Sequence, residues 1–263
     1  MRRKYSTDLS DEERARLKAR FPSSKSPGRP RAHSLRDIFD AIFYVLRSGC
    51  PWRLLPRDFP PWSTVYYHFR RFRLNGLWHL ILRALRAADR KRVGRNPEPS
   101  AAIVDSQSVK TTEESAHPSG YDPHKKVGGR KRHLLVDTMG LPLSICVTPA
   151  NVRDQHGARL LLIGRKLLMP RLKKIWADGA YDLAWLKSWC KKEGSWELEI
   201  VERDLQSKGF KVLPRRWVVE RTFGWLSRNR RLAKDYERRV QTSEILIEVA
   251  TIRLLLRRLA RAA

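Results

Sequence analysis

The chain of 263 residues carries 55 lysines and arginines against 27 acidic residues, which gives a formal net charge of +28. Its hydrophobic fraction of 41% is enough for a packed core and argues against a disordered chain. A charge so far from zero indicates a polyanionic partner, most naturally nucleic acid, with a merely basic, ribosomal-type surface as the alternative. The sequence has neither an apolar run of about twenty residues, which a membrane span requires, nor the apolar segment of a signal peptide. We therefore expect a cytoplasmic protein that acts on DNA or RNA, without a membrane partner.

The first part of the chain predicts short, capped helices. Ser10 followed by Glu13 is the pattern of a capping box, and it predicts a helix over residues 10–20. Ser34 precedes residues 35–49, in which apolar residues recur at helical spacing up to a glycine. The stretch between the two helices is rich in Pro, Gly, Ser and Arg, which indicates a linker.

A turn studded with prolines, CPWRLLPRDFPPW, connects the second helix to a third, for which Ser63 is the expected N-cap. The third helix carries Arg70, Arg71 and Arg73, and helix is expected to continue to residue 91. A helix, a tight turn and an arginine-rich helix together suggest a helix-turn-helix module that binds DNA. An ordinary helical hairpin fits the same pattern equally well.

The segment RKRVGRNPEPS is charged and contains two prolines, so we expect a domain boundary that divides the chain into residues 1–95 and 96–263. The periodicity then changes to that of strands, in AIVDS, in RHLLVDTMGLPLSICVTP on both sides of its DTMG turn, and in LKKIWADGAYD. Helices are expected after the strands, over residues 183–192, 214–229 and 243–260. A sheet followed by helices predicts an α/β or α+β domain.

Three acidic residues lie where strands end or where a helix meets the sheet. Asp105 ends the strand in IVDSQS, and Asp178 ends the strand in IWADGAY. Glu220 lies in the helix PRRWVVERTFGWL, beside its apolar face and one turn after Arg216, so it can reach the strand ends. Each acid taken singly has an ordinary explanation, namely a turn for the aspartates and a solvated ion pair with Arg216 for the glutamate.

A cluster of acids in a basic protein makes physical sense when it binds metal. Carboxylates repel phosphates and therefore weaken a nucleic-acid site unless a cation lies between them. In phosphodiester cleavage, two Mg²⁺ ions about 3.5–4 Å apart neutralise charge on the attacking water and the leaving oxygen, and hard oxygen ligands hold them. Asp105 is therefore interpreted as a metal ligand.

The segment EESAHPSGYDPHKKVGGRKRH, residues 113–133, is polar and ends strongly basic. Its first half reads as a solvated loop. The basic residues of its second half are predicted to contact phosphates, and they are Lys125, Lys126, Arg130, Lys131 and Arg132.

Taken together, these segments resemble bacterial insertion-sequence transposases with an Asp-Asp-Glu triad, of the insertion-sequence-five group. The matching stretches are VDSQSVKT, GGRKRHLLVDTMGLPL, ADGAYD, RRWVVERTFGWLSRNRRLAKDYE and, nearer the N-terminus, PWRLLPRDFPPWSTVYYHFRRF. They cover most of the chain and follow the order of the family. The resemblance implies an α/β, ribonuclease H-like catalytic domain, a mixed sheet flanked by helices, preceded by a small all-α domain of the helix-turn-helix type.

The resemblance also implies a site. Asp105, Asp178 and Glu220 match the catalytic, metal-binding triad, expected to hold two Mg²⁺ ions with Mn²⁺ as a substitute. Arg216 matches an arginine that precedes the glutamate by four residues in related transposases, and we expect it to contact DNA. The interval of 220 − 178 = 42 residues leaves little room for the β domain inserted in some relatives, and we expect none.

One part of the family signature is not present. Related transposases have a tyrosine three residues before that arginine and a lysine seven residues after the glutamate. The corresponding residues here are Leu213 and Ser227. Arg228 and Arg230 are alternatives for the role of the lysine.

The implied activity is DNA transposition. Metal-activated water is expected to cut DNA at an element end, and the freed 3′-hydroxyl to attack target DNA. The N-terminal helices are expected to bind terminal inverted repeats, and concerted cutting of two ends implies a homodimer on double-stranded DNA, associated with the nucleoid. Three alternatives stay open: a nuclease or resolvase of the same fold without strand transfer, a non-enzymatic helix-turn-helix regulator, and a decayed transposase.

Overall fold

The computed structural model describes residues 4–18, 32–115, 117–201 and 215–262. The chain forms two compact units. Unit 1 contains Met1–Val93, Arg228–Ala233 and Ile245–Ala263, and unit 2 contains Gly94–Ser227 and Lys234–Glu244.

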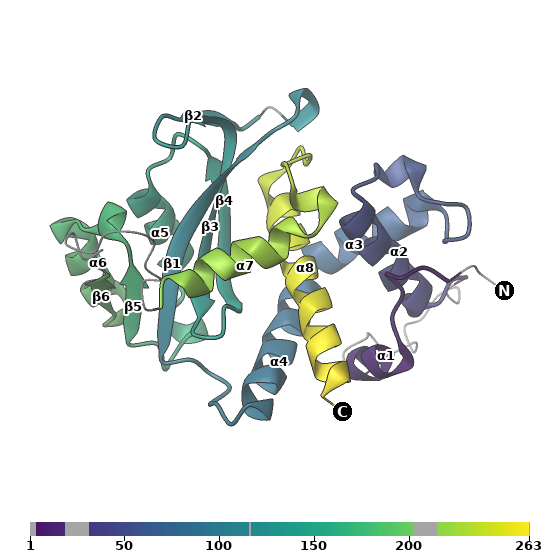
Figure 1. Ribbon diagram of the computed structural model, residues 1–263, viewed down its shortest axis with the longest axis horizontal. Helices are drawn as coiled ribbons and strands as arrows, with labels where there is room; N and C mark the ends of the chain where they lie inside the picture. Colours follow the sequence, from purple (N-terminus) through teal and green to yellow (C-terminus); the bar gives the residue numbers. More distant parts are fainter. Residues whose placement is uncertain (1–3, 19–31, 116, 202–214, 263) are drawn as a thin grey trace, which may run out of the picture. The chain divides into compact units, whose positions relative to one another are not determined.

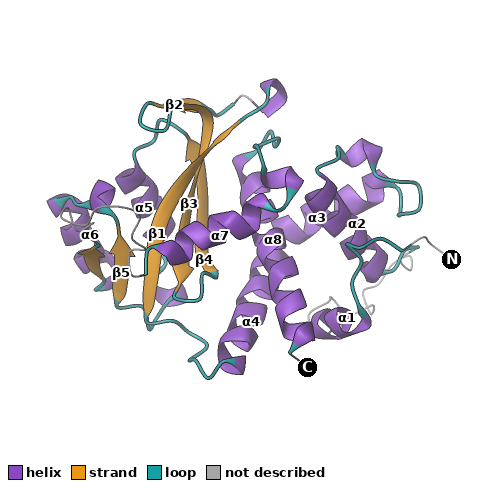
Figure 2. Cartoon of the chain, in the orientation of Figure 1, coloured by secondary structure: helices purple, strands orange, loops and turns teal. Residues whose placement is uncertain are grey.

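Unit 1 is helical (Figures 1 and 2). Its elements are α1 (Asp11–Lys18), α2 (Leu35–Ser48), the 3₁₀ turn η1 (Trp52–Leu54), α3 (Trp62–Leu74), α4 (Leu77–Arg92), the 3₁₀ turn η5 (Arg230–Leu232) and most of α8 (Val240–Arg261). A cluster of aromatic rings fills its core, with Trp78 packed edge-on against Phe39 and Phe72. The Trp78 indole also donates a hydrogen bond to the Phe69 carbonyl, so its only polar atom is satisfied inside that core.

The capping signals of the first two helices are confirmed. Ser10 Oγ accepts a hydrogen bond from the Glu13 N–H, and the Glu13 carboxylate accepts one from the Ser10 N–H, as a capping box requires. The Ser34 side chain caps α2, and Gly49 ends that helix in the left-handed conformation. The last two residues of the first predicted helix, and most of the predicted linker, lie outside the described residues.

The predicted N-cap of the third helix, Ser63, is wrong. α3 begins at Trp62, directly after Pro61, and Ser63 lies inside its first turn. Pro61 is the N-cap residue, with φ −48° and ψ 134°, and its lack of an N–H costs the helix no hydrogen bond because that N–H lies outside the helical ladder.

The last helix is shared between the two units, unlike the single cut predicted from the sequence. Its residues from 245 onward group with the N-terminal helices. Within unit 1, Arg253 pairs with the buried carboxylate of Glu13, and Arg258 Nη1 lies 3.5 Å from Asp89 Oδ2. Apolar residues at helical spacing on α8, such as Val249, Ile252 and Leu256, are buried. Their burial explains why this part of the helix belongs to unit 1.

Unit 2 is built on a six-stranded sheet (Figure 1). Its strands are β1 (Ala101–Lys110), β2 (Gly120–Asp122), β3 (Val127–Asp137), β4 (Pro142–Pro149), β5 (Lys174–Ala177) and β6 (Glu197–Ile200). β3 pairs antiparallel with β1 on one side and with β2 and β4 on the other, whereas β5 is parallel to both β1 and β6. The order β4-β3-β1-β5-β6 is the mixed sheet of a ribonuclease H-like fold, as predicted.

The helices of unit 2 determine which face of β1 carries which side chains. Ala102 and Val104 belong to the hydrophobic core that β1 shares with α5 (Asp154–Leu162) and α6 (Ala184–Gly194). α7 (Trp217–Ser227) packs against β1 as well, and it lies across that strand in Figure 1. Since side chains alternate along a strand, Asp105 points away from the α5 core, whereas Ser106 points toward it.

Among the described residues, no helix combines the length and the apolar character that crossing a lipid bilayer demands.

Candidate active site

Asp105 and Asp178 lie at matching positions of two neighbouring parallel strands. The register pairs Ala101 with Lys174, Ala102 with Ile175 and Ile103 with Trp176, an offset of 73 residues. Asp105 and Asp178 are separated by the same offset, 178 − 105 = 73. Asp178 follows the last residue of β5, whereas Asp105 does not end its strand as the sequence predicted, because β1 continues to Lys110 through its pairing with β3. Both carboxylates lie just beyond the point where the pairing of β1 with β5 stops.

A backbone N–H orients each of these carboxylates. The Ser106 N–H donates to Asp105 Oδ1 at 2.7 Å, and the Ala180 N–H donates to Asp178 Oδ1 at 3.0 Å. Asp178 is the N-cap of the short 3₁₀ turn η4 (Gly179–Tyr181), and the expected Asp-Gly turn is therefore present as well. Asp178 can serve both the turn and a binding site, because the turn uses only Oδ1 and Oδ2 can contact other groups.

The surroundings of Asp105 disfavour its negative charge. The pKa of Asp105 is raised to about 6, mainly by burial and to a smaller extent by the negative charge of Asp178. The Ser106 N–H and the cationic side chains of Lys125 and Arg216 act in the opposite direction. A divalent cation bound nearby would favour the ionised form of Asp105.

Glu220 lies on α7, and Arg216 connects it to the strand ends. Arg216 Nη2 is 3.3 Å from Asp178 Oδ2 and 3.8 Å from Glu220 Oε1. The Glu220 side chain is 58% exposed, so it faces solvent beside the pair of aspartates instead of being buried with them. The structure thus gathers the two aspartates directly and brings the glutamate to them through a shared arginine.

The donor chemistry fits a hard divalent cation at the aspartates. Two carboxylates with free oxygen lone pairs, at the end of a rigid sheet, are the ligands that Mg²⁺ and Mn²⁺ prefer. Within the described part of the chain, no three His, Cys, Asp or Glu side chains converge closely enough to enclose a single ion. Glu220 therefore has to approach the aspartates more closely than it does here to complete a three-carboxylate site.

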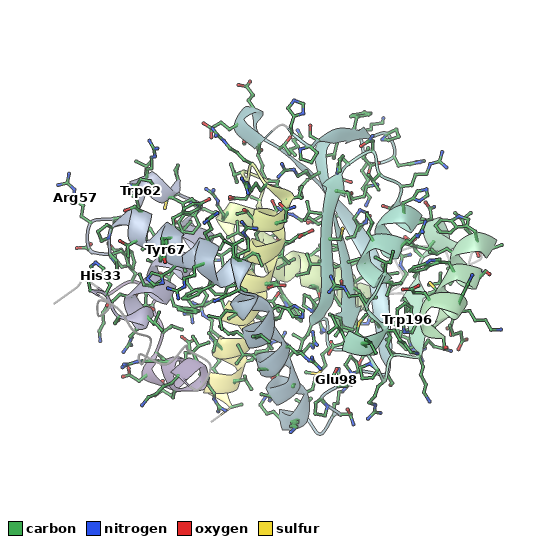
Figure 3. All side chains as sticks on the ribbon, turned by 180° about the vertical axis from the view of Figure 1, so that it is seen from behind. His33, Arg57, Trp62, Tyr67, Glu98 and Trp196 are labelled. Carbon is green, nitrogen blue, oxygen red and sulfur yellow. The ribbon has the colours of Figure 1, made fainter. Side chains whose placement is uncertain are left out.

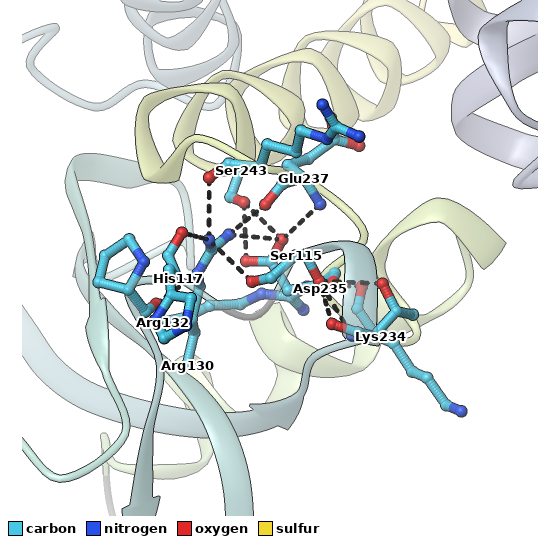
Figure 4. A network of polar contacts seen from close by, with 11 residues as sticks. Ser115, His117, Arg130, Arg132, Lys234, Asp235, Glu237 and Ser243 are labelled. Atoms are coloured by element: carbon cyan, nitrogen blue, oxygen red, sulfur yellow. Dashed lines mark hydrogen bonds and ion pairs between the residues drawn. The ribbon is translucent and has the colours of Figure 1, made fainter.

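Three basic residues predicted to contact phosphates instead hold the fold together. Arg130, Lys131 and Arg132 are no more than 4% exposed, because β3 places them inside the sheet. Arg130 Nη1 lies 3.1 Å from Asp235 Oδ1 and donates to the Glu237 carbonyl, and Arg130 Nη2 donates to the Ser115 carbonyl (Figure 4). Arg132 Nη2 donates to the Lys234 carbonyl in the same network. The prediction that these three side chains contact DNA is therefore wrong. Their charges are neutralised by partners inside unit 2.

Lys125 and Lys126 do lie on the surface, in the turn between β2 and β3. Lys125 Nζ donates to the Ser106 carbonyl at 2.9 Å and to Ser106 Oγ at 3.2 Å. Its ammonium group therefore contacts the residue that directly follows Asp105. The assignment of these two lysines to phosphate contacts stays a prediction.

A buried ionic network behind β1 was not predicted from the sequence. Lys131 Nζ lies 3.2 Å from Asp122 Oδ2 and 3.0 Å from Asp154 Oδ1. Asp154 Oδ1 also accepts a hydrogen bond from Ser106 Oγ at 2.8 Å, and Asp122 accepts one from Ser108 Oγ at 2.6 Å. Burial raises the pKa of Asp154, but the Ser106 hydroxyl and Lys131 outweigh that effect and lower it. The alternating serines that follow Asp105 on β1 were the available signal.

The predicted DNA-binding arginines of unit 1 lie on α3. Arg70 and Arg71 are exposed, and Arg73 is half-buried. Exposed aromatic rings share that part of unit 1: Tyr67 is 55% exposed and Trp62 is 38% exposed. Figure 3 labels both, with Arg57, among the helices of unit 1. Exposed cations and rings are side-chain types that can contact phosphates and bases, and the assignment of these arginines to DNA contacts stays a prediction.

Comparison with known proteins agrees with this geometry. Residues 96–255, more than half of the chain, match the family described as "Transposase DDE domain". Residues 9–82 match the family described as "Putative transposase of IS4/5 family". A protein of Burkholderia cepacia described as "Putative transposase for insertion sequence element IS402" is 33% identical over 120 residues, which cover 42% of this chain and 55% of that relative. The chain therefore spans about half the length of that relative, and by its family matches it belongs to the insertion-sequence transposases with a DDE domain.

Proposed function

We propose that this transposase cuts DNA at the ends of an insertion sequence and joins the freed 3′ ends to target DNA, with Asp105, Asp178 and Glu220 as its catalytic carboxylates. The observation that carries the proposal is the common offset of 73 residues, which places Asp105 of β1 and Asp178, directly after β5, side by side where the pairing of these strands stops, in a strongly basic protein. Acids at such a position oppose DNA binding unless they hold cations.

Asp105 and Asp178 would hold the metal, with Glu220 as the third ligand. When bound, two Mg²⁺ ions supply neutralisation of the charge that develops on the scissile phosphate, the attacking oxygen and the leaving oxygen. The backbone N–H groups of Ser106 and Ala180 keep the two aspartates oriented, so that little reorganisation is needed when DNA arrives. Mn²⁺ is expected to replace Mg²⁺ because it prefers the same oxygen ligands.

Arg216 is suited to two tasks in the same site. In the absence of DNA its guanidinium compensates Asp178 and Glu220. A guanidinium can also bind a phosphate through two parallel hydrogen bonds, so Arg216 can transfer from the carboxylates to the DNA backbone when the substrate binds. Lys125 and Lys126 add positive charge in the turn between β2 and β3, where Lys125 contacts β1.

Unit 1 is proposed to bind the terminal inverted repeats through α3. Its exposed arginines supply contacts to phosphates, and the exposed rings of Trp62 and Tyr67 supply apolar surface beside them. Because two element ends must be cut together, we propose a homodimer on double-stranded DNA, in the cytoplasm and at the nucleoid.

The test is a cleavage and strand-transfer assay with Mg²⁺ and DNA that carries the inverted repeats flanking the coding region. We expect the wild-type protein to form strand-transfer products, and the variants Asp105→Ala, Asp178→Ala and Glu220→Ala to bind the DNA without cutting it. Retained cutting in any one variant removes that residue from the site. Cutting without joining would favour a nuclease of the same fold, and DNA binding without metal-dependent nicking would favour a non-enzymatic regulator.

A further inference from the structure

Two residues, Ser106 and Ala180, connect the catalytic aspartates to the rest of unit 2. The Ser106 N–H donates to Asp105 Oδ1, and the Ala180 N–H donates to Asp178 Oδ1. Each aspartate is thus aimed by a backbone group a short distance further along the chain. The direction of both carboxylates depends on where those two backbone groups are held.

Two consecutive side chains at the start of α5 hold them. Asp154 Oδ1 accepts a hydrogen bond from Ser106 Oγ at 2.8 Å. Gln155 Nε2 donates to the carbonyl of Ala180. One turn of helix therefore contacts the residue that aims Asp105 and the residue that aims Asp178, although 48 and 25 residues separate the partners in sequence.

The link to β1 comes from behind the strand. Ser106 and Asp105 point to opposite faces of the sheet because side chains alternate along a strand. Asp154 therefore fixes Ser106 on the face that packs against α5, while Asp105 keeps its open face for ligands. Asp154 acts without occupying the metal site.

The start of α5 is itself anchored. Lys131 Nζ lies 3.0 Å from Asp154 Oδ1, and the same ammonium group lies 3.2 Å from Asp122 Oδ2. Lys131 is 4% exposed and Asp122 is 2% exposed. On the next residue of the helix, the His156 ring stacks on Trp185 of α6 with centroids 5.5 Å apart. Because the start of α5 is held by Lys131 and by the packing of His156 on Trp185, it can keep Ser106 and Ala180 at defined positions.

We propose that Asp154 and Gln155 are positioning residues that set the distance and direction of the two catalytic aspartates for divalent-metal binding. The inference rests on the proposed function and deepens it. Supports of this kind around metal ligands typically contribute about 10- to 100-fold to metal affinity. Loss of either link lets one strand end move relative to the other, so metal affinity falls more than the maximal rate of cleavage does.

The test uses the full-length, metal-free protein and Mn²⁺ as the probe, with free Mn²⁺ measured by electron paramagnetic resonance. The variants are Ser106→Ala and Gln155→Met, neither of which changes a charge, and Asp154→Ala with its conservative partner Asp154→Asn. Ser144→Ala is the matched control: Ser144 is 7% exposed against 6% for Ser106, and its Oγ donates to the Leu161 carbonyl at 2.9 Å at the other end of α5. Thermal unfolding of every variant records the loss of stability separately.

We expect Ser106→Ala, Gln155→Met and Asp154→Ala to raise the Kd for Mn²⁺ by about tenfold or more, with cleavage largely recovered at saturating Mn²⁺. Asp154→Asn keeps an acceptor for Ser106 Oγ and should lose less, and Ser144→Ala should bind Mn²⁺ like the wild type. The inference is overturned if Ser106→Ala and Gln155→Met bind Mn²⁺ with wild-type affinity while Asp105→Ala and Asp178→Ala do not bind it, or if Ser144→Ala weakens binding as much as they do. Undiminished Mn²⁺ binding by Asp105→Ala and Asp178→Ala overturns the proposed function instead.

Discussion

Arg216 and Asp178 form an ion pair at the end of β5, with 3.3 Å between Nη2 and Oδ2. The same guanidinium nitrogen lies 3.8 Å from Glu220, so one arginine compensates two of the three proposed catalytic carboxylates. This arrangement places a positive charge close to the proposed metal ligands.

Removing that arginine should therefore separate metal affinity from catalysis. We expect Arg216→Ala to bind Mn²⁺ more tightly in the absence of DNA, by about tenfold, because a competing cation near the ligands is lost. Cleavage at saturating Mn²⁺ should nevertheless fall, since the proposed phosphate contact is lost as well. Titration with Mn²⁺ and a single-turnover cleavage assay measure the two effects. Weaker Mn²⁺ binding in Arg216→Ala would instead mean that the arginine mainly orients the carboxylates.

Asp105 should make the metal-free protein less stable above pH 6 than an uncharged residue does. Its folded pKa of about 6 exceeds the ordinary value of 3.8, so the folded state binds more protons between these values and its stability falls as pH rises through that window. The shift corresponds to at most about 3 kcal/mol. We expect Asp105→Asn to unfold in urea at higher denaturant concentration than the wild type at pH 7.5 in the presence of a chelator. The two proteins should converge near pH 4, and equal stability at both pH values would refute this account.

His133 should make unit 2 sensitive to acid. Burial lowers the pKa of His133 to about 4, and its Nε2 lies 2.9 Å from Thr148 Oγ1. The unfolded state binds the proton from about pH 6.5 downward, whereas the folded state resists it until about pH 4. Stability is therefore lost as pH falls through this window, by up to about 3 kcal/mol. We expect His133→Gln to show a flatter dependence of the unfolding free energy on pH between 6.5 and 4, and an unchanged slope would contradict the assignment.

Arg130 should be required for folding and not for DNA affinity. Its guanidinium is fully buried against Asp235, and removal of one partner of a buried ion pair costs about 3–5 kcal/mol. We expect Arg130→Ala to lower the unfolding free energy by this amount. Lys126→Ala, on the exposed turn before β3, is the comparison: its stability should not change, whereas its DNA affinity should drop. A stable Arg130→Ala protein with weakened DNA binding would restore the phosphate contact that the sequence suggested.

Arg70 and Arg71 should contribute to DNA binding through salt-sensitive contacts. Each phosphate neutralised by a side chain adds about 0.9 to the slope of log affinity against log salt concentration. We expect Arg70→Ala and Arg71→Ala each to weaken binding and to reduce that slope by about one. Fluorescence anisotropy at several salt concentrations measures both quantities. Unchanged slopes would mean that another face of unit 1 binds the DNA.

The sequence predicted the features that depend on local patterns. The capping box of Ser10 and Glu13 needs only neighbouring residues, and so do the two strands around the DTMG turn. Asp105 and Asp178 were found because each directly follows a short apolar run. Their shared register could not be read in this way, since it depends on the pairing of β1 with β5 across 73 residues.

The basic run before residue 133 was misread for a physical reason. Charged residues in a glycine-containing segment normally indicate a solvated loop, but β3 begins at Val127 and continues through the run. Arg130 and Lys131 tolerate burial because Asp235, Asp122 and Asp154 compensate them, and these partners are distant in sequence. The contacts of Asp154 with Ser106 and of Gln155 with Ala180 could not be predicted either, because these partners are also distant in sequence.

β6 was not predicted, and its side chains have a consequence for the behaviour of many copies together. In the described part of the chain, β6 pairs with β5 alone, and Glu197 and Glu199 both pair with Lys174 across that junction. An edge strand with open backbone groups invites a strand from another molecule, and charged residues discourage such pairing. Two glutamates against one lysine leave this border of the sheet net negative, so like-charge repulsion disfavours pairing of β6 with the β6 of a second copy.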